Sequence, residues 1–146
     1  MPTVRPGPRK RARREPTPPT PAGIWQGCLR LWIEIDGRNA LGPGKMRLLE
    51  AIAATKSLSA AARQLGMSYR LAWKHLKLLE ERVGLPVVEP HRGGTEGGGS
   101  ILTPDGRALL DAYARFHAEV DEFVATATVR HFGRWAQRPR PSPPRA

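Results

Sequence analysis

The sequence predicts a mostly α-helical domain with a small β wing, that is, a winged helix-turn-helix with a long C-terminal helix. Three stretches indicate this fold class. Residues 57–83 read as two helices joined by a glycine turn, residues 85–103 as two β-prone segments around glycines, and residues 104–128 as one long helix. We expect residues 24–129 to form the one folded domain of this 146-residue chain.

The net charge of +11 belongs mainly to the two ends of the chain. Residues 1–23 and 130–146 each carry +5 and are rich in proline, whereas the segment between them carries only +1. Such segments bury too little apolar surface to offset their ordering entropy, so we expect a disordered basic arm at the start and a disordered Arg/Pro tail at the end. A DNA-binding role for the domain therefore depends on where its cations lie, not on their number.

Several classes of function are disfavoured by composition and motifs. Cys28 is the only cysteine, so no disulfide can form within the chain and a reducing cytoplasm fits. No run of about 18 apolar residues predicts a membrane span. The four histidines lack metal-ligand spacing and no nucleophile motif is present, so we expect no metal, no cofactor, no catalytic residue and no enzyme.

The chain before the helix-turn-helix predicts one strand and one helix. Apolar and polar residues alternate over 29–36, which indicates a half-buried strand. A helix should follow from about Pro43 or Lys45 to Ala54, because its apolar residues share one face. We expect the strand at 29–36 to join the sheet of the wing as a third member.

The helix-turn-helix is predicted over 57–83. Its first helix should run over 60–65 with Ser59 as N-cap. Gly66 should end that helix, since glycine readily adopts the left-handed conformation of a helix C-cap. Ser68 should then cap the second helix two residues later.

The second helix separates its chemistry by face. Apolar residues recur on one stripe, while Arg70, Lys74 and Lys77 recur about half a turn away. A helix fits the major groove of DNA, and its N-terminal residues usually reach the base edges. The residues that we expect to contact DNA on this helix are Ser68, Tyr69, Arg70, Trp73, Lys74 and Lys77. A merely solvated charged face is the alternative, and Glu80 and Glu81 do dilute the positive charge.

Residues 85–103 predict a hairpin that would serve as the wing. Two β-prone segments flank a glycine-rich loop, and prolines keep the first of them at an edge. His91 and Arg92 stand at the entry of the loop, where we expect them to contact the DNA backbone or minor groove. A flexible linker is the alternative. A phosphate-binding loop is not, because no Gly-Lys-Ser/Thr follows the glycines.

The last predicted helix runs over 104–128. Thr103 should cap it, Pro104 should take the first helical position and Asp105 should lie in the first turn. Its apolar residues alternate spacings of four and three, as in a coiled coil. Those that we expect at a homodimer contact are Leu109, Tyr113, Phe116, Val120 and Phe123. Packing of the same stripe against its own domain is the alternative.

Three stretches resemble a known family. They are SLSAAARQLGMSYRLAWK at 57–74, VEPHRGGTEGGGS at 88–100 and ILTPDGRALL at 101–110. Together they resemble the N-terminal DNA-binding domain of ModE-type molybdate-responsive regulators, whose helix-turn-helix is related to that of LysR-type regulators. The resemblance implies a winged helix-turn-helix, a homodimer and control of genes for molybdenum uptake or use. It also implies that Ser68, Tyr69, Arg70 and Trp73 lie at or near the DNA.

The resemblance does not extend to ligand sensing. Members of the family carry a C-terminal molybdate-binding region, and this sequence ends about 17 residues after the predicted long helix. We therefore expect no oxyanion binding, and either constitutive action or a signal from a separate sensor protein.

The function that we expect is sequence-specific binding of double-stranded DNA by a homodimeric transcription regulator in the cytoplasm. A non-specific, architectural DNA-binding protein driven by its basic tails is the first alternative. A protein-interaction module, for which DNA binding is incidental, is the second.

Overall fold

The computed structural model describes residues 23–92 and 99–139. The described residues form a unit of residues 27–127 and a second unit made of residues 23–26 and 128–139. The arm and the end of the tail, for which we expected disorder, lie outside the described residues, as does the loop 93–98. No helix in the part of the chain described here is long and apolar enough to cross a membrane.

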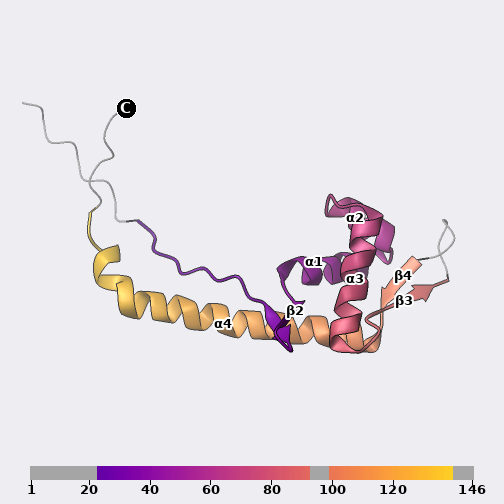
Figure 1. Cartoon of the computed structure of the whole chain (residues 1–146). Helices are drawn as coiled ribbons and strands as arrows, with labels where there is room; N and C mark the ends of the chain where they lie inside the picture. The colour runs from indigo at the N-terminus through magenta and orange to yellow at the C-terminus, as the bar shows by residue number, and fades with distance from the viewer. Residues whose placement is uncertain (1–22, 93–98, 140–146) are drawn as a thin grey trace, which may run out of the picture. The chain divides into compact units, whose positions relative to one another are not determined.

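The larger unit is a winged helix-turn-helix (Figure 1). The elements of the chain follow in the order β1 Ile33–Ile35, β2 Arg38–Leu41, α1 Pro43–Thr55, α2 Leu58–Gln64, α3 Tyr69–Val83, β3 Val88–His91, β4 Gly99–Leu102 and α4 Pro104–Ala136, and the last residues of α4 belong to the smaller unit. Figure 1 shows α2 at one end of α3 and the strands β3 and β4 beside α3. The predicted fold class is therefore confirmed.

The core lies where α1, α2 and α3 meet. α1 contributes its largest buried side chains, Leu48, Leu49 and Ile52, to this core. Ala61 and Ala62 on α2 are buried as well, and their small size lets the neighbouring helices approach closely. The remaining buried hydrophobic residues are Ala40, Leu41, Met46, Ala51, Leu58, Ala72, Leu76, Leu79, Val87, Leu110 and Tyr113.

α2 begins earlier than the sequence predicted. Ser57, not Ser59, is its N-cap, because the Ser57 hydroxyl accepts a hydrogen bond from the backbone N–H of Ala60 at 3.2 Å. Starting the helix at Leu58 places that side chain in the core, where it is buried. The prediction of Ser59 was wrong because the burial of Leu58 decides between the two serines. That burial cannot be read from the residues that form the cap.

The turn and the next cap agree with the sequence. Gly66 has φ +66°, the left-handed conformation expected after a helix. The Ser68 hydroxyl accepts a hydrogen bond from the backbone N–H of Leu71 at 3.2 Å and so caps α3. Gly84, with φ +72°, ends α3.

The strand predicted at 29–36 is shorter and pairs elsewhere. Only Ile33–Ile35 forms β1, and it pairs antiparallel with β2 in a two-stranded sheet of its own. Asp36 and Gly37 both have positive φ and turn the chain back at once, so β1 meets its immediate successor. The expectation that this strand joins the wing was therefore wrong.

The wing is an antiparallel hairpin of β3 and β4. Its register pairs Val88 with Leu102 at the base and His91 with Gly99 at the other end. β4 is also fastened to the junction of α1 and α2, because the backbone N–H of Ser100 donates to the carbonyl of Lys56 at 3.0 Å. The hairpin is thus joined to the helices and is not a free linker.

α4 begins as predicted and ends later. The Thr103 hydroxyl accepts a hydrogen bond from Gly106 N at 3.0 Å, which confirms the N-cap. The helix continues to Ala136, so the prediction of an end at about 128 and a disordered tail from 130 was wrong over these residues. Within the smaller unit, the Phe132 ring stacks on Trp25 and also lies beside Trp135. These ring contacts stabilise a helical turn that polar composition alone does not predict.

Candidate nucleic-acid interface

The candidate interface is the exposed side of α3. Ala72, Leu76 and Leu79 are buried and attach this helix to the core. Arg70 and Lys74 lie on the opposite side and are exposed, as predicted. Neither makes an ion pair within the described ranges, so the guanidinium of Arg70 and the ammonium of Lys74 can both meet an anion.

Aromatic side chains lie beside these cations. Tyr69 is 56% exposed and Trp73 is 48% exposed, so neither ring is buried in the core. Leu71 is also exposed, although the sequence reasoning did not select it. Its position off the buried stripe was the available signal. Flat and apolar side chains next to cations suit contacts to bases and to thymine methyl groups.

Ser68 has a structural part at this site. Its hydroxyl is engaged by Leu71 N–H at the start of α3, so it fixes where the helix begins. The first turn of α3, with Tyr69 and Arg70, therefore has a defined position. A direct contact from Ser68 to DNA stays a prediction.

Lys77 differs from the other cations on α3. Its ammonium forms an ion pair with the Glu80 carboxylate, with 2.7 Å between Nζ and Oε2, and lies 5.8 Å from the centre of the Trp73 ring. A phosphate that approaches Lys77 must therefore compete with Glu80. Of the three cations predicted as one stripe, Lys77 is thus engaged within the chain, unlike Arg70 and Lys74.

Glu80 is the residue here that the sequence reasoning missed. Its Oε1 accepts hydrogen bonds from the backbone N–H groups of Val87 at 3.0 Å and Val88 at 3.3 Å. Burial by itself raises the pKa of Glu80, but the hydrogen bonds from Lys77, Val87 and Val88 outweigh it and hold that pKa below its usual value. The carboxylate of Glu80 therefore stays charged, and it binds the backbone at the start of the wing. No short sequence motif predicts these hydrogen bonds, because Val87 and Val88 follow Glu80 by seven and eight residues.

The wing residues lie at the outer end of the hairpin. His91 is the last residue of β3 and is half-buried, and Arg92 follows it and is exposed. No hydrogen bond or ion pair joins either of them to α3 in the ranges described. The structure brings the base of the wing to α3 through Glu80, while contacts of His91 and Arg92 with DNA stay predictions.

The stripe predicted for dimerisation divides into two parts. Leu109 packs on the core, and Tyr113 is buried and donates its hydroxyl to the carbonyl of Leu31 at 2.9 Å. Burial also raises the pKa of Tyr113. Phe116 is 43% and Phe123 66% exposed, and Val120 is half-buried. The first part of the stripe thus attaches α4 to its own domain, and only the second part is free for another chain.

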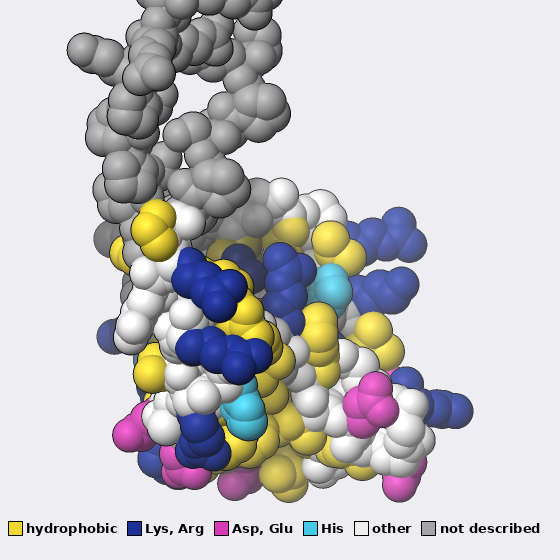
Figure 2. All heavy atoms as spheres, turned by 90° about the vertical axis from the view of Figure 1, so that its left-hand side faces the viewer, with side chains coloured by type: hydrophobic (Ala, Val, Ile, Leu, Met, Phe, Trp, Pro, Cys, Tyr) yellow, Lys and Arg dark blue, Asp and Glu magenta, His cyan; other side chains and the backbone are white. Residues whose placement is uncertain are grey.

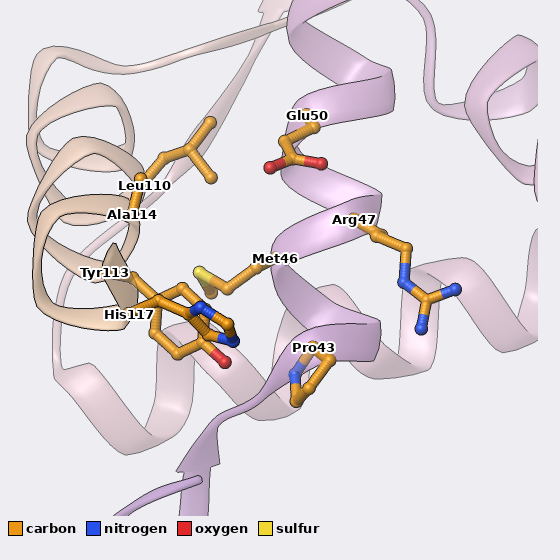
Figure 3. Close-up of a pocket in the computed structure, with 8 residues that line it drawn as sticks. All are labelled: Pro43, Met46, Arg47, Glu50, Leu110, Tyr113, Ala114 and His117. Atoms are coloured by element: carbon orange, nitrogen blue, oxygen red, sulfur yellow. The ribbon is translucent and has the colours of Figure 1, made fainter. Parts of the chain in front are cut away.

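A groove of about 330 Å³ lies between α1 and α4 (Figure 3). Figure 3 shows Met46 pointing from α1 toward the rings of Tyr113 and His117 on α4, while Arg47 points away. His117 is engaged by Asp121, with 2.9 Å between Nδ1 and Oδ2. No described residue of α3 or of the wing lines this groove, so it is separate from the candidate interface.

The face of the molecule in Figure 2 carries no single block of positive charge. On the face in Figure 2, Lys and Arg side chains are spread among hydrophobic ones and do not gather in one block. Among the described residues, no group of three or more His, Cys, Asp and Glu side chains could hold a metal ion. The case for nucleic acid rests on the exposed side of α3.

Comparison with known proteins agrees with this geometry. Residues 44–107 match the model of the bacterial regulatory helix-turn-helix proteins of the lysR family. This segment is similar to a lysR-type helix-turn-helix. It spans α1 to the first turn of α4 and so includes α3 and the wing.

Some relatives that match the chain are named for molybdenum, and others are named as transcriptional regulators. The chain is 40% identical over 86 residues to the molybdenum-pterin-binding protein MopB of Rhodobacter capsulatus, covering 59% of this chain and 32% of MopB. It is 32% identical over 131 residues to the transcriptional regulator ModE of Haemophilus influenzae, covering 74% and 51%. It is 31% identical over 88 residues to the ModE dual regulator of Escherichia coli, covering 60% and 34%. The resemblance to ModE-type regulators is thus confirmed.

The chain spans about a third to a half of the length of these curated relatives. Among solved structures, the BenM DNA-binding domain in complex with benA site 1 DNA is 22% identical, with a TM-score of 0.45, over 58% of this chain and 93% of that one. That likeness is too slight to add to the argument.

Proposed function

We propose that this protein is a sequence-specific transcription regulator that reads double-stranded DNA with α3. The observation that carries the proposal is the exposed first half of α3 in a lysR-type segment. Arg70 and Lys74 point outward there, Tyr69 and Trp73 stand beside them, and the opposite side is anchored in the core. Because bacterial DNA lies in the cytoplasm, we propose that the protein acts there.

Replacing Arg70 tests base reading. If Arg70 makes a bidentate contact with a base, Arg70→Ala should cost about 1–3 kcal/mol of binding free energy on the preferred duplex and relax the preference at one position. Fluorescence anisotropy on preferred and scrambled duplexes at near-physiological salt measures both effects. Arg115→Ala, which removes an exposed arginine from α4, is the matched control. A uniform loss on all duplexes makes Arg70 a phosphate contact instead.

Lys74 and Lys77 should differ in salt dependence. Lys74 has no ion-pair partner to release among the described residues, so Lys74→Ala should lower the slope of log K against log salt by about 0.9 if it touches a phosphate. Lys77→Ala should lower it by less, because Glu80 already neutralises that ammonium. Equal changes of slope would show that the ion pair with Glu80 does not persist on DNA.

We also propose a homodimer formed through the exposed part of α4. No described residue of α4 after Tyr113 is buried in its own chain, although Phe116, Val120 and Phe123 continue the apolar stripe. Phe123→Asp should shift sedimentation toward the monomer. Val129→Asp, an exposed apolar position on the opposite side of the helix, should leave association unchanged. If both variants sediment like the wild type, the stripe is not the contact.

The genes that we propose as targets concern molybdenum uptake or use. The names of a molybdenum-pterin-binding relative and of a molybdenum transport relative support this. Affinity selection of genomic fragments tests it, and an inverted repeat would also support the dimer. A separate sensor protein is the proposed source of any regulatory signal. Stoichiometric molybdate binding in calorimetry would contradict that part.

A tail-driven, non-specific DNA-binding protein is the second candidate, because most of the net charge lies near the chain ends. A fragment of residues 23–139 separates the two candidates. It keeps α4 and the contact of Trp25 with Phe132 intact. A regulator keeps its sequence preference in this fragment, whereas a tail-driven protein loses most of its affinity for any DNA.

A further inference from the structure

The Glu80 carboxylate connects the recognition helix to the wing. Only 13% of its side chain is exposed, and its two oxygens have different partners. Oε2 meets the Lys77 ammonium on α3, and Oε1 accepts from the N–H groups of Val87 and Val88 where β3 begins. One side chain thus restrains a cation on α3 and the first residues of the wing at the same time.

The same short segment is held from its other side by the start of α4. The Thr103 hydroxyl donates to the carbonyl of Pro86 at 2.7 Å, and Thr103 N–H donates to the carbonyl of Val87 at 3.0 Å. Val87 is fully buried. Its N–H is bound by α3 and its C=O by the residue that caps α4, so the position of β3 depends on both helices.

β4 is attached to the helices by a separate contact. Ser100 N–H donates to the carbonyl of Lys56, and Gly99 packs directly against that carbonyl. No such bond holds the first strand of the wing to α1 or α2 in the described residues. On the side of β3, which ends at His91 and leads to Arg92, Glu80 is therefore the link to α3.

We propose that Glu80 is a positioning residue for DNA binding, which sets β3 and the Arg92 side chain that follows it relative to α3. This inference rests on the proposed function. It can be tested by the sign of the change in DNA affinity when Glu80 is replaced. A carboxylate near the proposed DNA face repels phosphates, so its removal should strengthen DNA binding if charge alone matters. If Glu80 acts by position, its removal should weaken binding instead.

Four variants separate charge from position. Glu80→Ala removes both the charge and the acceptor, and Glu80→Gln removes the charge but keeps an oxygen for Val87 and Val88. Glu80→Asp keeps the charge on a shorter side chain. Glu81→Ala is the matched control, because Glu81 is the next residue, is exposed and has no bond among those described for it. All four are made in the full chain, with folding checked by circular dichroism.

The readouts are affinity for preferred and scrambled duplexes, and exchange of the Val87 and Val88 amide protons by NMR. We expect Glu80→Ala to bind the preferred duplex about tenfold more weakly, about 1.4 kcal/mol, and to expose both amides to exchange. Glu80→Gln and Glu81→Ala should bind at least as tightly as the wild type and keep the amides protected. Glu80→Asp should resemble Glu80→Ala in affinity and in amide exchange. If Glu80→Ala does not fold, the comparison of Glu80→Asp with Glu80→Gln separates position from charge.

Two failures are distinguishable. The inference is overturned if Glu80→Ala and Glu80→Asp keep amide protection and Glu80→Ala binds DNA as tightly as Glu81→Ala. The hydrogen bond from Ser100 to Lys56 would then suffice to hold the wing in place. If the wild type prefers no duplex, the proposed function fails. The sign of the change on any DNA then still decides whether Glu80 acts by charge or by position.

Discussion

Gly106 lies in the first turn of α4 at a point where no side chain fits. A Cβ built on this glycine would collide with the carbonyl oxygen of Val87. That carbonyl cannot move away freely, because it accepts a hydrogen bond from Thr103 N–H and the neighbouring N–H is bound by Glu80. Gly106→Ala therefore forces apart the start of α4 and the base of the wing.

Two opposing effects set the size of the change. Alanine is favoured over glycine inside a helix by up to about 1 kcal/mol. Overpacking a well-filled site by a methyl group typically costs about 1–3 kcal/mol, and here the colliding atom is backbone. The clash should win, so we expect Gly106→Ala to lower the free energy of unfolding by about 1–2 kcal/mol. For a domain of this size each kcal/mol lowers Tm by roughly 4–8 °C.

The matched control is Gly133→Ala in the same helix. A Cβ there would lie 3.8 Å from Val129 Cγ1, an ordinary contact. This variant should be as stable as the wild type or more stable by up to about 1 kcal/mol. Urea unfolding followed by circular dichroism compares the midpoints, with the slope m as a check on two-state behaviour. A Gly106→Ala protein as stable as Gly133→Ala would refute the close packing of α4 on Val87.

Three further predictions concern caps, burial and pH. Ser57→Ala should cost about 1 kcal/mol in urea unfolding, and Ser59→Ala almost nothing, because only Ser57 caps α2. Tyr113→Phe should cost about 0.5–1.5 kcal/mol in the same assay, since it removes the hydrogen bond to the carbonyl of Leu31; no loss would argue against that contact. Since the pKa of Glu80 is lowered from 4.5, its ionic contribution to stability is present above that pH and is lost as pH falls through the lowered pKa. In thermal melts Glu80→Gln should flatten this acid limb, and an unchanged limb would contradict the assignment.

Local signals in the sequence determined most of the helix-turn-helix. Gly66 must adopt positive φ after α2, and Ser68 supplies the oxygen that α3 needs at its N-terminus. The positions of Ala72 and Arg70 around the helix axis suffice to distinguish the buried side of α3 from its exposed side. Each of these features is set by residues within a few positions of one another, and so a single sequence contains them.

Less of the candidate site than of the fold could be predicted from the sequence. The exposed residues of α3 could be selected by their angle around the helix. Lys77 could not be separated from Arg70 and Lys74, because its ion pair depends on where the Glu80 carboxylate lies. The stripe on α4 likewise gave no sign of where it stops packing on its own domain, which the contact of Tyr113 with Leu31 shows.

The sequence by itself therefore determined the order of the elements apart from β2, the turn and the two faces of α3. Only the tertiary structure decided which serine caps α2, where the apolar stripe of α4 stops packing on its own domain and what Glu80 does. The physical reason is the range of the interactions. Caps and helix faces arise between near neighbours, whereas Tyr113 meets Leu31 across 82 residues. Such contacts exist only after the core has brought distant backbone groups together.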